Sequence, residues 1–452
     1  MSLLENLLLL FIILFIYFLI VIILNKKGIL EKYNISLYGP ALLLRTKRGR
    51  NFLKKIANKK RFWKAFGSFG IVFCFIMMIL MITLLIFQTW TVIGFTPEQK
   101  EVLPGIEFGL LIPGINPILP LEYLVYILIA LIVAVVVHEF SHGILTFASK
   151  LKVKSLGILY LIVPLGAFCE PDEQLLRKTK TSNRMRVYAA GPTSNFAVVL
   201  ISLILFSFVF MSAVHPIEGT HVFYVVEDTP ADEINLSPGT VLTNLNDTKI
   251  TNISDFYYII GNTIAGQRVN ISYFKEGSIH STNITLADRY RYTNNESHKN
   301  LSFLGVGFNP YEGYISVLKN PFSNNIPNNL ILLYALPFFG YIAGYNPIAS
   351  PFTNSLLING PLSLIPDNIF WGIVNTIYWI FWLNLAVGLF NVLPIIPLDG
   401  GILFNDAIKA FIKKIKKNIT DEQREKIAKN FSAIISLLIL FIVLFPWIIK
   451  YF

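Results

Sequence analysis

Long apolar stretches recur along the chain, and they determine its class. Six of them reach the roughly 20 residues that a helix needs to cross a bilayer. They lie at residues 3–24, 69–87, 121–147, 187–214, 371–393 and 431–449. The first has no basic start and no small-residue cleavage site, which favours a retained anchor over a cleaved signal peptide. The pattern predicts an α-helical polytopic membrane protein with about six spans.

The composition agrees with this class. Apolar residues make up 54% of the 452 residues, charged residues 14%, and the mean hydropathy is +0.59. A soluble chain carries about 25% charged residues, so a water-soluble globular protein and a disordered chain are both excluded. Two cysteines, Cys74 and Cys169, are too few for a disulfide framework or a four-thiolate zinc site.

The basic residues indicate which loops face the cytoplasm. Residues 25–66 hold 13 Lys and Arg, residues 148–186 hold eight, and residues 402–430 hold eight, whereas residues 215–370 hold seven. The positive-inside rule places the three basic loops in the cytoplasm and both termini outside. The alternative for the cytoplasmic loop 25–66 is a nucleic-acid patch, but spans flank this loop and the topology rule accounts for its charge. We therefore expect the lipid bilayer as a partner and no nucleic acid.

The largest segment outside the membrane is predicted at residues 215–320. Short alternating runs such as Val269-Asn-Ile-Ser-Tyr273, separated by Gly and Pro, are typical of β-strands. Seven of the nine Asn-x-Ser/Thr sequons lie here, which fits an outside location, although an Asn-rich composition alone would also produce them. The pattern predicts an inserted, extracytoplasmic, β-rich domain.

One apolar segment does not fit the span pattern. Residues 330–345 form a stretch of about 16 residues, too short to span comfortably, and contain Pro337, Gly340 and Gly344. A full crossing would place the basic residues 402–430 outside. We therefore interpret residues 321–370 as containing a re-entrant or interfacial segment.

The third apolar stretch contains the motif His138-Glu139-Phe140-Ser141-His142. Two histidines four residues apart lie on one helix face, so both imidazoles can bind one metal ion, and the Glu between them can take a proton from water at that ion. Charged groups inside an apolar helix are costly and are normally functional. The alternative is a pair of hydrogen-bonded interior histidines with a structural Glu.

A zinc site that keeps an open position needs a third ligand. The candidate is Asp399, which follows Pro394 and Pro397 and precedes Gly400 and Gly401. The prolines break the helix and the glycines free the chain, and such a broken backbone is tolerated in a membrane where it lines a cavity. Taken alone, the same residues also fit a turn with a solvated Asp cap.

Two further segments are candidates for the same region. Ala190-Gly191-Pro192-Thr193-Ser194-Asn195 opens the fourth apolar stretch, where small residues permit close helix packing and Asn195 can bond across helices or serve packing alone. Residues 152–170, which include Pro164 and Gly166, fit a hairpin that dips into the bilayer and offers an open edge to an extended substrate. A plain amphipathic loop fits these residues equally well.

The three motifs together resemble the signatures of the site-2 proteases, which are zinc-dependent intramembrane proteases. The resemblance rests on His138–His142, Gly191–Asn195 and Asn391-Val-Leu-Pro-Ile-Ile-Pro-Leu-Asp399-Gly-Gly, in that order along the chain. It implies one Zn²⁺ per chain on His138, His142 and Asp399, with Glu139 activating water and Asn391 holding the substrate carbonyl. It also implies that the β-loop with Pro164 and Gly166 pairs with the substrate. Asn195 is a further candidate for substrate binding.

The inserted domain has a likeness of its own. Val226-Glu-Asp-Thr-Pro-Ala231, followed by Leu236-Ser-Pro-Gly-Thr-Val241, resembles a PDZ domain, with Asp247-Thr248 where a Gly is usual. In the family, such a domain would filter substrates by size or bind a freed C-terminus. The sequence does not distinguish these two roles.

The predicted function is an intramembrane metalloprotease that cleaves single-span membrane proteins in a prokaryotic, archaeal plasma membrane. A membrane scaffold or transporter with a structural zinc site is one alternative. A zincin that faces the cytosol and uses a downstream Glu as third ligand is another. The predicted division of the chain is 1–120 with two spans, 121–214 with the first two motifs, 215–320 PDZ-like, 321–370 re-entrant, 371–401 with Asp399, and 402–452 with the last loop and span.

Overall fold

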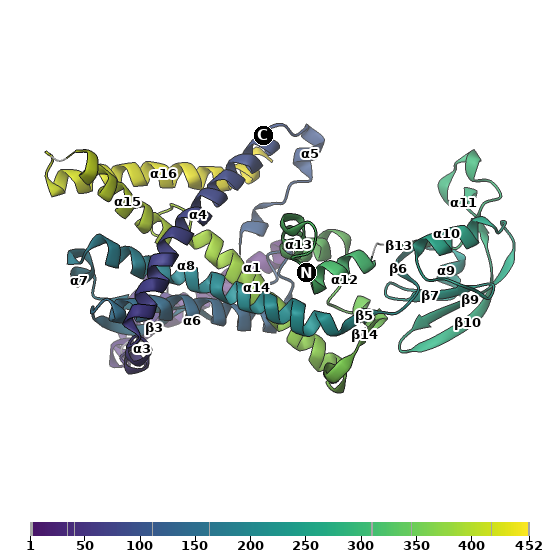
Figure 1. Ribbon diagram of the computed structural model, residues 1–452, viewed down its shortest axis with the longest axis horizontal. Helices are drawn as coiled ribbons and strands as arrows, with labels where there is room; N and C mark the ends of the chain where they lie inside the picture. Colours follow the sequence, from purple (N-terminus) through teal and green to yellow (C-terminus); the bar gives the residue numbers. More distant parts are fainter. Residues whose placement is uncertain are drawn as a thin grey trace. The chain divides into compact units, whose positions relative to one another are not determined.

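The chain folds into two compact units. The computed structural model describes residues 3–450 except 34, 40, 111, 162, 309, 310, 345 and 417. Unit 1 consists of residues 1–201 and 379–452, and unit 2 consists of residues 202–378 (Figure 1). Unit 2 is therefore inserted in the chain between two parts of unit 1.

Helices make up most of unit 1. They are α1 (Leu3–Lys26), α2 (Ile29–Lys32), α3 (Arg50–Ile56), α4 (Lys60–Ile93), α5 (Pro97–Glu101), α6 (Leu124–Ala148), α7 (Glu173–Lys178), α8 (Thr181–Ile204), α14 (Asp367–Asn391), α15 (Asp399–Ile415) and α16 (Asp421–Ile449). Helix α8 runs into unit 2 and continues there as a π-helical turn, and α14 enters unit 1 from unit 2.

Six helices are long and apolar enough to cross a membrane, as the sequence predicts for a polytopic membrane protein. Five of them, which contain α4, α6, α8, α14 and α16, correspond to the predicted spans from the second to the sixth, of which the fourth and fifth extend one and two residues past their helices. Helix α8 begins at Thr181, so the segment 190–195 lies inside this helix and does not open it. The predicted first span falls in α1, where the described apolar stretch Phe11–Lys26 is shorter than the six.

The sixth candidate span is α13 (Ile326–Ala343), which contains Pro337 and is followed by Gly344 in a left-handed conformation. Its 18 residues form one continuous helix where we expected a re-entrant or interfacial segment, and Tyr345 lies outside the described residues. An even number of crossings places both termini on one side. The outside location of both termini therefore depends on whether α1 and α13 cross, and it stays a prediction.

A four-stranded antiparallel sheet accompanies these helices. Its order is β1 (Ile35–Tyr38), β2 (Ala41–Thr46), β3 (Val153–Leu161) and β4 (Val163–Pro171). The hairpin β3–β4 agrees with the strand interpretation of residues 152–170, of which Ile162 lies outside the described residues. The partner hairpin β1–β2 comes from the basic loop 25–66 and was not predicted. Strand β4 lies at the edge of the sheet, next to α6.

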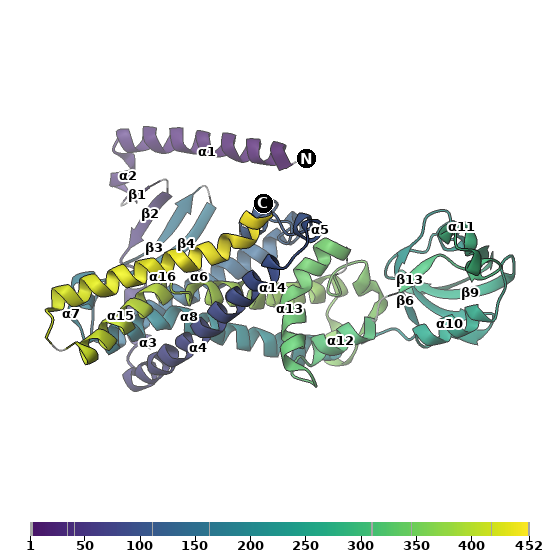
Figure 2. The same ribbon diagram turned by 90° about the horizontal axis from the view of Figure 1, so that it is seen from above.

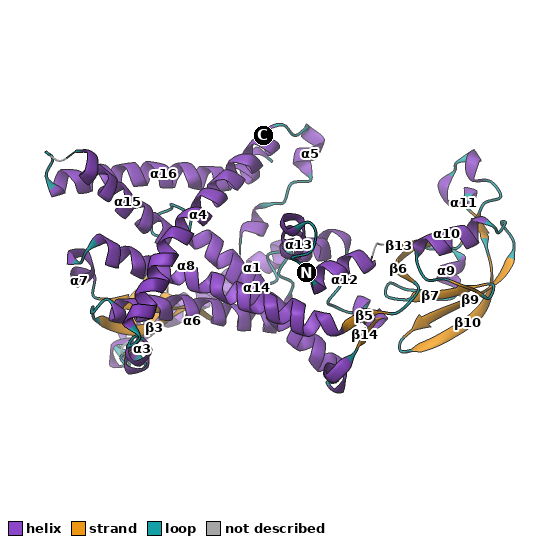
Figure 3. Ribbon diagram, viewed as in Figure 1, coloured by secondary structure: helices purple, strands orange, loops and turns teal. Residues whose placement is uncertain are grey.

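Unit 2 contains the predicted β-rich domain, and its strands belong to other sheets than β1–β4 (Figure 3). The sheet has the order β10-β9-β7-β6-β13, with β8 paired to β7. The strands are β6 (Thr220–Val225), β7 (Val241–Leu245), β8 (Thr248–Lys249), β9 (Arg268–Lys275), β10 (Ser278–Thr285) and β13 (Val306–Phe308). Two short pairs, β5 (Val214–Pro216) with β14 (Leu356–Ile358) and β11 (Ala287–Asp288) with β12 (Ser302–Phe303), complete the described strands.

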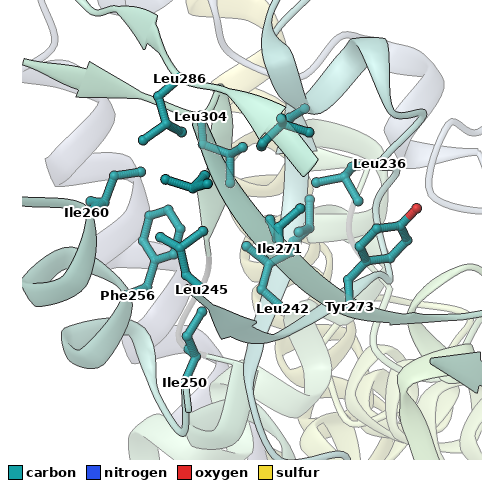
Figure 4. Close-up of a cluster of buried hydrophobic side chains, with 14 residues drawn as sticks. Leu236, Leu242, Leu245, Ile250, Phe256, Ile260, Ile271, Tyr273, Leu286 and Leu304 are labelled. Carbon is teal, nitrogen blue, oxygen red and sulfur yellow. The ribbon is translucent and has the colours of Figure 1, made fainter. Parts of the chain in front are cut away.

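The alternation of β9 builds the core of this domain. Val269, Ile271 and Tyr273 are buried, as the run in the sequence predicts, and they pack with Phe256 and Ile260 (Figure 4). The last two come from α10 (Ile253–Gly261), where a spacing of four residues places them on one face. The turn between β9 and β10 consists of Glu276 and Gly277, both with positive φ, which suits a two-residue hairpin.

The remaining helices of unit 2 are short apart from α13. They are α9 (Pro230–Glu233), α11 (Tyr290–Thr293) and α12 (Tyr311–Lys319). Tyr378 near the end of unit 2 donates a hydrogen bond of 2.9 Å to the Leu333 carbonyl of α13.

Candidate active site

The two histidines of the motif lie one turn apart on α6. The rings of His138 and His142 have centroids 4.8 Å apart, and both side chains are buried. Ala130 and Ala134 precede His138 on the same face, also buried. Small residues at this spacing let neighbouring helices approach the face that carries the histidines.

Asp399 reaches these histidines from the first residue of α15. Its Oδ2 atom lies 3.0 Å from His138 Nε2 and 3.2 Å from His142 Nε2. The three ligand atoms lie within 4.8 Å of one another. Residues about 260 positions apart in the sequence are therefore brought to one point.

Two glycines allow α15 to begin so close to the preceding segment. A Cβ atom on Gly400 would lie 2.3 Å from the Val392 carbonyl oxygen, and one on Gly401 would lie 2.5 Å from the Ile395 backbone. Any larger residue would push the helix, and Asp399 with it, away from the segment after α14. Ser436 of α16 also holds that segment, because its hydroxyl oxygen accepts a hydrogen bond of 3.1 Å from the Ile396 amide.

Hydrogen bonds at Nδ1 of each ring fix the orientation and the tautomer of the two imidazoles. His142 Nδ1 lies 2.7 Å from the Val187 carbonyl oxygen, which can only accept, so Nδ1 carries the hydrogen. His138 Nδ1 lies 3.0 Å from Asn195 Oδ1. In the neutral form of both rings, Nε2 is therefore the nitrogen with the lone pair, and it faces Asp399.

Three acceptors therefore converge in a buried place. Asp399 Oδ2 is buried without a hydrogen-bond donor. A proton on one imidazole would relieve one of the two close contacts, whereas a divalent cation would relieve both. Imidazole nitrogen and carboxylate oxygen are zinc ligands, and tetrahedral bonds of about 2.0–2.1 Å place ligand atoms roughly 3.3 Å apart. The residues thus fit a zinc ion, and three protein ligands leave its fourth position open.

The backbone of α8 covers the two rings at Gly191. A Cβ atom there would lie 2.6 Å from Nε2 of His138 and 2.6 Å from Nε2 of His142. Only a glycine can bring α8 this close to the ligand atoms. The residue is therefore required by the packing of the two helices around the site.

The remaining charged group of the motif is held by the sheet. Glu139 is partly buried, and its Oε2 atom accepts a hydrogen bond of 2.8 Å from the Cys169 amide of β4. Since β4 is the edge strand next to α6, the carboxylate lies between the helix that carries the histidines and the open edge of the sheet.

The comparisons with known proteins assign the family. The model of peptidase family M50 matches residues 126–440, which include most of α6, all of α8 and α15, and the inserted unit. The chain belongs to peptidase family M50. Its three converging ligands, from the first and last of the three sequence motifs, lie inside the matched region.

Curated relatives of this M50 member cover most of its length. An uncharacterized protein of Methanocaldococcus jannaschii is 26% identical over 84% of this chain and 80% of its own length. A protein named zinc metalloprotease RasP, from Shouchella clausii, is 25% identical over 69% of this chain and 73% of its own length. A putative zinc metalloprotease of Clostridium perfringens is 25% identical over 65% and 89%.

Two solved structures similar to part of the M50 chain are PDZ domains. They come from SdrC-like proteins of Listeria monocytogenes and Listeria innocua, with 18% and 20% identity, and each covers 20% of this chain at a TM-score of 0.18. They cover 87% and 93% of their own lengths. Scores this low carry no argument, so the description of the insertion as PDZ-like rests on the residues quoted above.

Asn195, a predicted substrate-binding residue, lies beside His138. It is fully buried, and its Nδ2 atom lies 3.3 Å from both the Ala134 carbonyl and Asn384 Oδ1. These two acceptors fix the orientation of the amide, because Nδ2 must face them and Oδ1 must then face His138. Asn195 therefore orients the ring of His138, and Asn384 of α14 orients the side chain of Asn195.

The other predicted residues lie nearer to the sheet or to the end of α14. Gly166 lines a cavity of about 190 Å³ between α6 and the sheet, together with Val135 and Val136 just before His138. Pro164 pairs with Tyr160 in the β3–β4 ladder, and its side chain lies outside the described residues. Asn391 ends α14, and its amide donates to the Val387 carbonyl at 3.0 Å.

Several contributors to the site were not found from the sequence. The Val187 carbonyl and the Cys169 amide are backbone groups, which carry no residue-type signal. Asn384 does carry a signal in the sequence, because an Asn seven residues before Asn391 in an apolar helix is a signal of the same kind as Asn195.

Proposed function

We propose that this M50 member is an intramembrane zinc metalloendopeptidase that hydrolyses peptide bonds in or near transmembrane helices. Its substrates would be single-span membrane proteins, cleaved in regulated intramembrane proteolysis. The observation that carries the proposal is the convergence of His138, His142 and Asp399, all acceptors, between apolar helices. The family match and the relatives named zinc metalloproteases support it.

We propose one zinc ion per chain on these three residues. When bound, the ion would supply a Lewis acid for the scissile carbonyl and would lower the pKa of water in its open position toward 7. Asn195 and the Val187 carbonyl would keep the two imidazoles in the tautomer that binds it. Gly191 would leave space for the zinc ion beside the Nε2 atoms of the two histidines.

Glu139 would act as the general base. Its carboxylate would take a proton from the attacking water and pass this proton to the leaving amine. The Cys169 amide holds the carboxylate through one oxygen, which leaves the other oxygen to receive the proton. Asn391 would donate to the substrate carbonyl oxygen once its amide turns away from Val387.

The substrate would bind as an added strand at β4. A helix must unwind before its peptide bond can reach the site, and pairing with an open sheet edge replaces the lost backbone hydrogen bonds. Among the described strands, β4 pairs only with β3, and Gly166 lines the cavity between this strand and α6. Val135 and Val136, which line this cavity, precede His138 on α6.

A structural zinc site would need four protein ligands. Among the described residues, the group that could hold an ion has three members, His138, His142 and Asp399, which favours a catalytic site. A downstream Glu is also not needed as the third ligand, because Asp399 is in place.

The decisive experiment pairs cleavage with metal analysis. Glu139→Gln should abolish cleavage of candidate single-span substrates in reconstituted vesicles and keep the zinc content of the wild type. Full activity of Glu139→Gln would exclude the general-base role. His138→Ala, His142→Ala and Asp399→Ala should each lose zinc, and unchanged zinc in all three would overturn the proposed site.

We propose the plasma membrane of a prokaryote, an archaeon, as the location. The six apolar helices support a multi-pass membrane protein, and the Methanocaldococcus relative supports the source. Immunodetection in separated membrane and soluble fractions would test the location.

A further inference from the structure

The sequons of the inserted domain exceed the number that its composition produces. Residues 215–320 contain 12 Asn, and Ser and Thr make up 18 of these 106 residues. With this content, about two of the Asn would have a Ser or Thr two positions later by chance. Seven do: Asn235, Asn246, Asn252, Asn270, Asn283, Asn295 and Asn300. The excess indicates a role beyond an Asn-rich composition for part of this set.

A sequon is the acceptor of an N-linked glycan, a bulky group that only the surface of a protein can carry. The transferase that adds the glycan has to reach the Asn amide and the hydroxyl two positions later together. It can do so where the whole tripeptide is exposed and where few hydrogen bonds tie it to other elements. The folded domain separates the seven sequons by this criterion.

Two sequons are held in the sheet. Asn270 of β9 and Asn283 of β10 lie opposite each other, and Asn270 Nδ2 donates to Asn283 Oδ1 at 3.1 Å. The middle residues of these two sequons, Ile271 and Ile284, are buried in the core of the domain. A transferase would have to pull both strands out of the sheet to bind these tripeptides.

Two other sequon Asn side chains hold backbone groups of their neighbours. Asn246 is joined to Asn270 by two bonds, because its amide donates to the Asn270 carbonyl at 2.8 Å and its Oδ1 accepts from the Asn270 amide at 3.0 Å. Asn252 caps α10, since its Oδ1 accepts a bond of 3.0 Å from the Asp255 amide. Turning either amide toward a transferase would break these bonds.

The sequons at 235–237 and 300–302 each have one residue anchored inside the domain. Leu236 is buried in the core. Ser302 is partly buried, and its hydroxyl donates to the Ile260 carbonyl at 2.7 Å. The hydroxyl that the transferase needs is therefore already used in the second case, and the middle of the tripeptide is inaccessible in the first.

The sequon Asn295-Glu296-Ser297 has none of these constraints. All three residues are exposed, and they lie in and just before the short turn Glu296–His298, which follows α11 at the margin of the domain (Figure 2). Asn295 Oδ1 accepts from the Ser297 amide at 3.1 Å and from the Ser297 hydroxyl at 2.8 Å. Glu296 forms an ion pair with Lys299. Among the described residues, the side-chain bonds of this sequon thus all end within residues 295–299.

We propose that Asn295 is an N-glycosylation site, modified in the folded protein. The co-substrate is an oligosaccharide that pyrophosphate links to a membrane lipid. Asn295 Nδ2 attacks C1 of the first sugar and forms the C1–N bond. The C1–O bond breaks, and its electron pair leaves with the lipid pyrophosphate. The Nδ2 atom gives one proton to a base of the transferase and keeps the other.

The site agrees with the predicted outside location of residues 215–320, and it does not depend on the proposed function. The test is peptide mass spectrometry of the full chain, purified from membranes of an archaeal host whose own surface protein carries N-linked glycans. The peptide with Asn295 should carry the mass of the host oligosaccharide, and Asn295→Gln should lose this mass. The peptides with Asn270 and Asn283 should be unmodified.

A matched pair of variants at Ser297 keeps the acceptor and changes the sequon alone. Ser297→Ala should lose the glycan on Asn295, whereas Ser297→Thr should retain it. A glycan that persists in Ser297→Ala would overturn the site, and so would an unmodified Asn295 beside a glycosylated surface protein of the host. Equal occupancy of all seven sequons would show that modification precedes folding and would overturn the selection by the fold. The measurement needs neither zinc nor cleavage, so it stands if the proposed function fails.

Discussion

Arg184 of α8 and Asp406 of α15 form an ion pair with two hydrogen bonds of 2.6 Å each. The Asp406 side chain is 3% exposed and that of Arg184 is 14% exposed. Three residues after Arg184 lies Val187, whose carbonyl orients His142, and Asp406 lies seven residues after Asp399 on α15. The pair therefore ties the helix that supplies Asp399 to the helix that orients a histidine.

Asp406→Asn should release α15 from α8 and lower zinc affinity. Removing one partner of a buried pair costs about 3–5 kcal/mol, because the other charge stays buried and unpaired. We expect a lower thermal unfolding temperature and reduced zinc content after dialysis. In Arg184→Lys both quantities should fall between those of the wild type and Asp406→Asn, because an ammonium lacks the planar fork that forms two parallel bonds to a carboxylate. Arg177→Gln, which breaks an exposed pair with Glu173, is the control and should change neither quantity. Full zinc retention by Asp406→Asn would contradict the positioning role.

Gly191→Ala should prevent metal binding. Its Cβ atom would lie 2.6 Å from the Nε2 atoms of both histidines, closer than any contact between a Cβ and a nitrogen permits. The backbone of α8 or the rings must shift, and the ligand atoms shift with them. The measurement is zinc stoichiometry of the purified protein. Gly340→Ala in α13, where no atom lies within 4 Å of the added methyl, is the control and should bind zinc normally. Normal zinc binding by Gly191→Ala would show that the site tolerates this shift.

The sequence predicted the parts of the site that depend on residue type and local spacing. A separation of four residues places His138 and His142 on one face in any helix. The Pro and Gly residues around Asp399 predict a break in the chain, and the structure has one, with α14 ending at Asn391 and α15 beginning at Asp399. The alternation at Val269, Ile271 and Tyr273 predicted a buried strand face for the same reason.

Contacts between distant backbone groups could not be predicted. The pairing of β2 with β3 joins residues 42–46 to 156–160, and the two segments have no complementary pattern beyond apolar content. The many Lys and Arg of residues 25–66 are typical of a charged loop, so the short strand Ile35–Tyr38 was not predicted, although Gly39-Pro40 is a turn signal. Asn195 could be recognised as functional, but its partner, His138, depends on how α8 packs against α6.

Acid should destabilise the β-rich domain through His221. Burial lowers the pKa of this histidine to about 4, although a hydrogen bond to the Ile217 carbonyl opposes the shift. The unfolded chain takes up the proton near pH 6.5, so the stability of the domain is full above that pH and falls as the pH drops from about 6.5 to about 4. The total loss is on the order of 3 kcal/mol.

Hydrogen exchange of the full chain would measure this effect in peptides that cover β6 and β7. Protection should decrease between pH 6.5 and pH 4.5 after correction for the intrinsic exchange rate. In His221→Phe the decrease should be smaller, because no group at this position takes up a proton. Equal pH dependence in the wild type and the variant would assign the effect to other groups.

Ala167→Pro should weaken cleavage without changing the fold. The amide of Cys169 points away from β3, since it donates to Glu139, and the alternation of a strand gives the amide of Ala167 the same direction. Ala167 therefore offers a donor at the open edge where we place the substrate. Proline removes this donor and is tolerated in edge strands where the amide faces outward. The loss of one backbone hydrogen bond, about 1 kcal/mol, should reduce kcat/KM roughly fivefold. Ala167→Val keeps the amide and is the control, with zinc content and thermal unfolding measured for both. Equal kcat/KM in the two variants would show that the substrate does not pair with β4 at this residue.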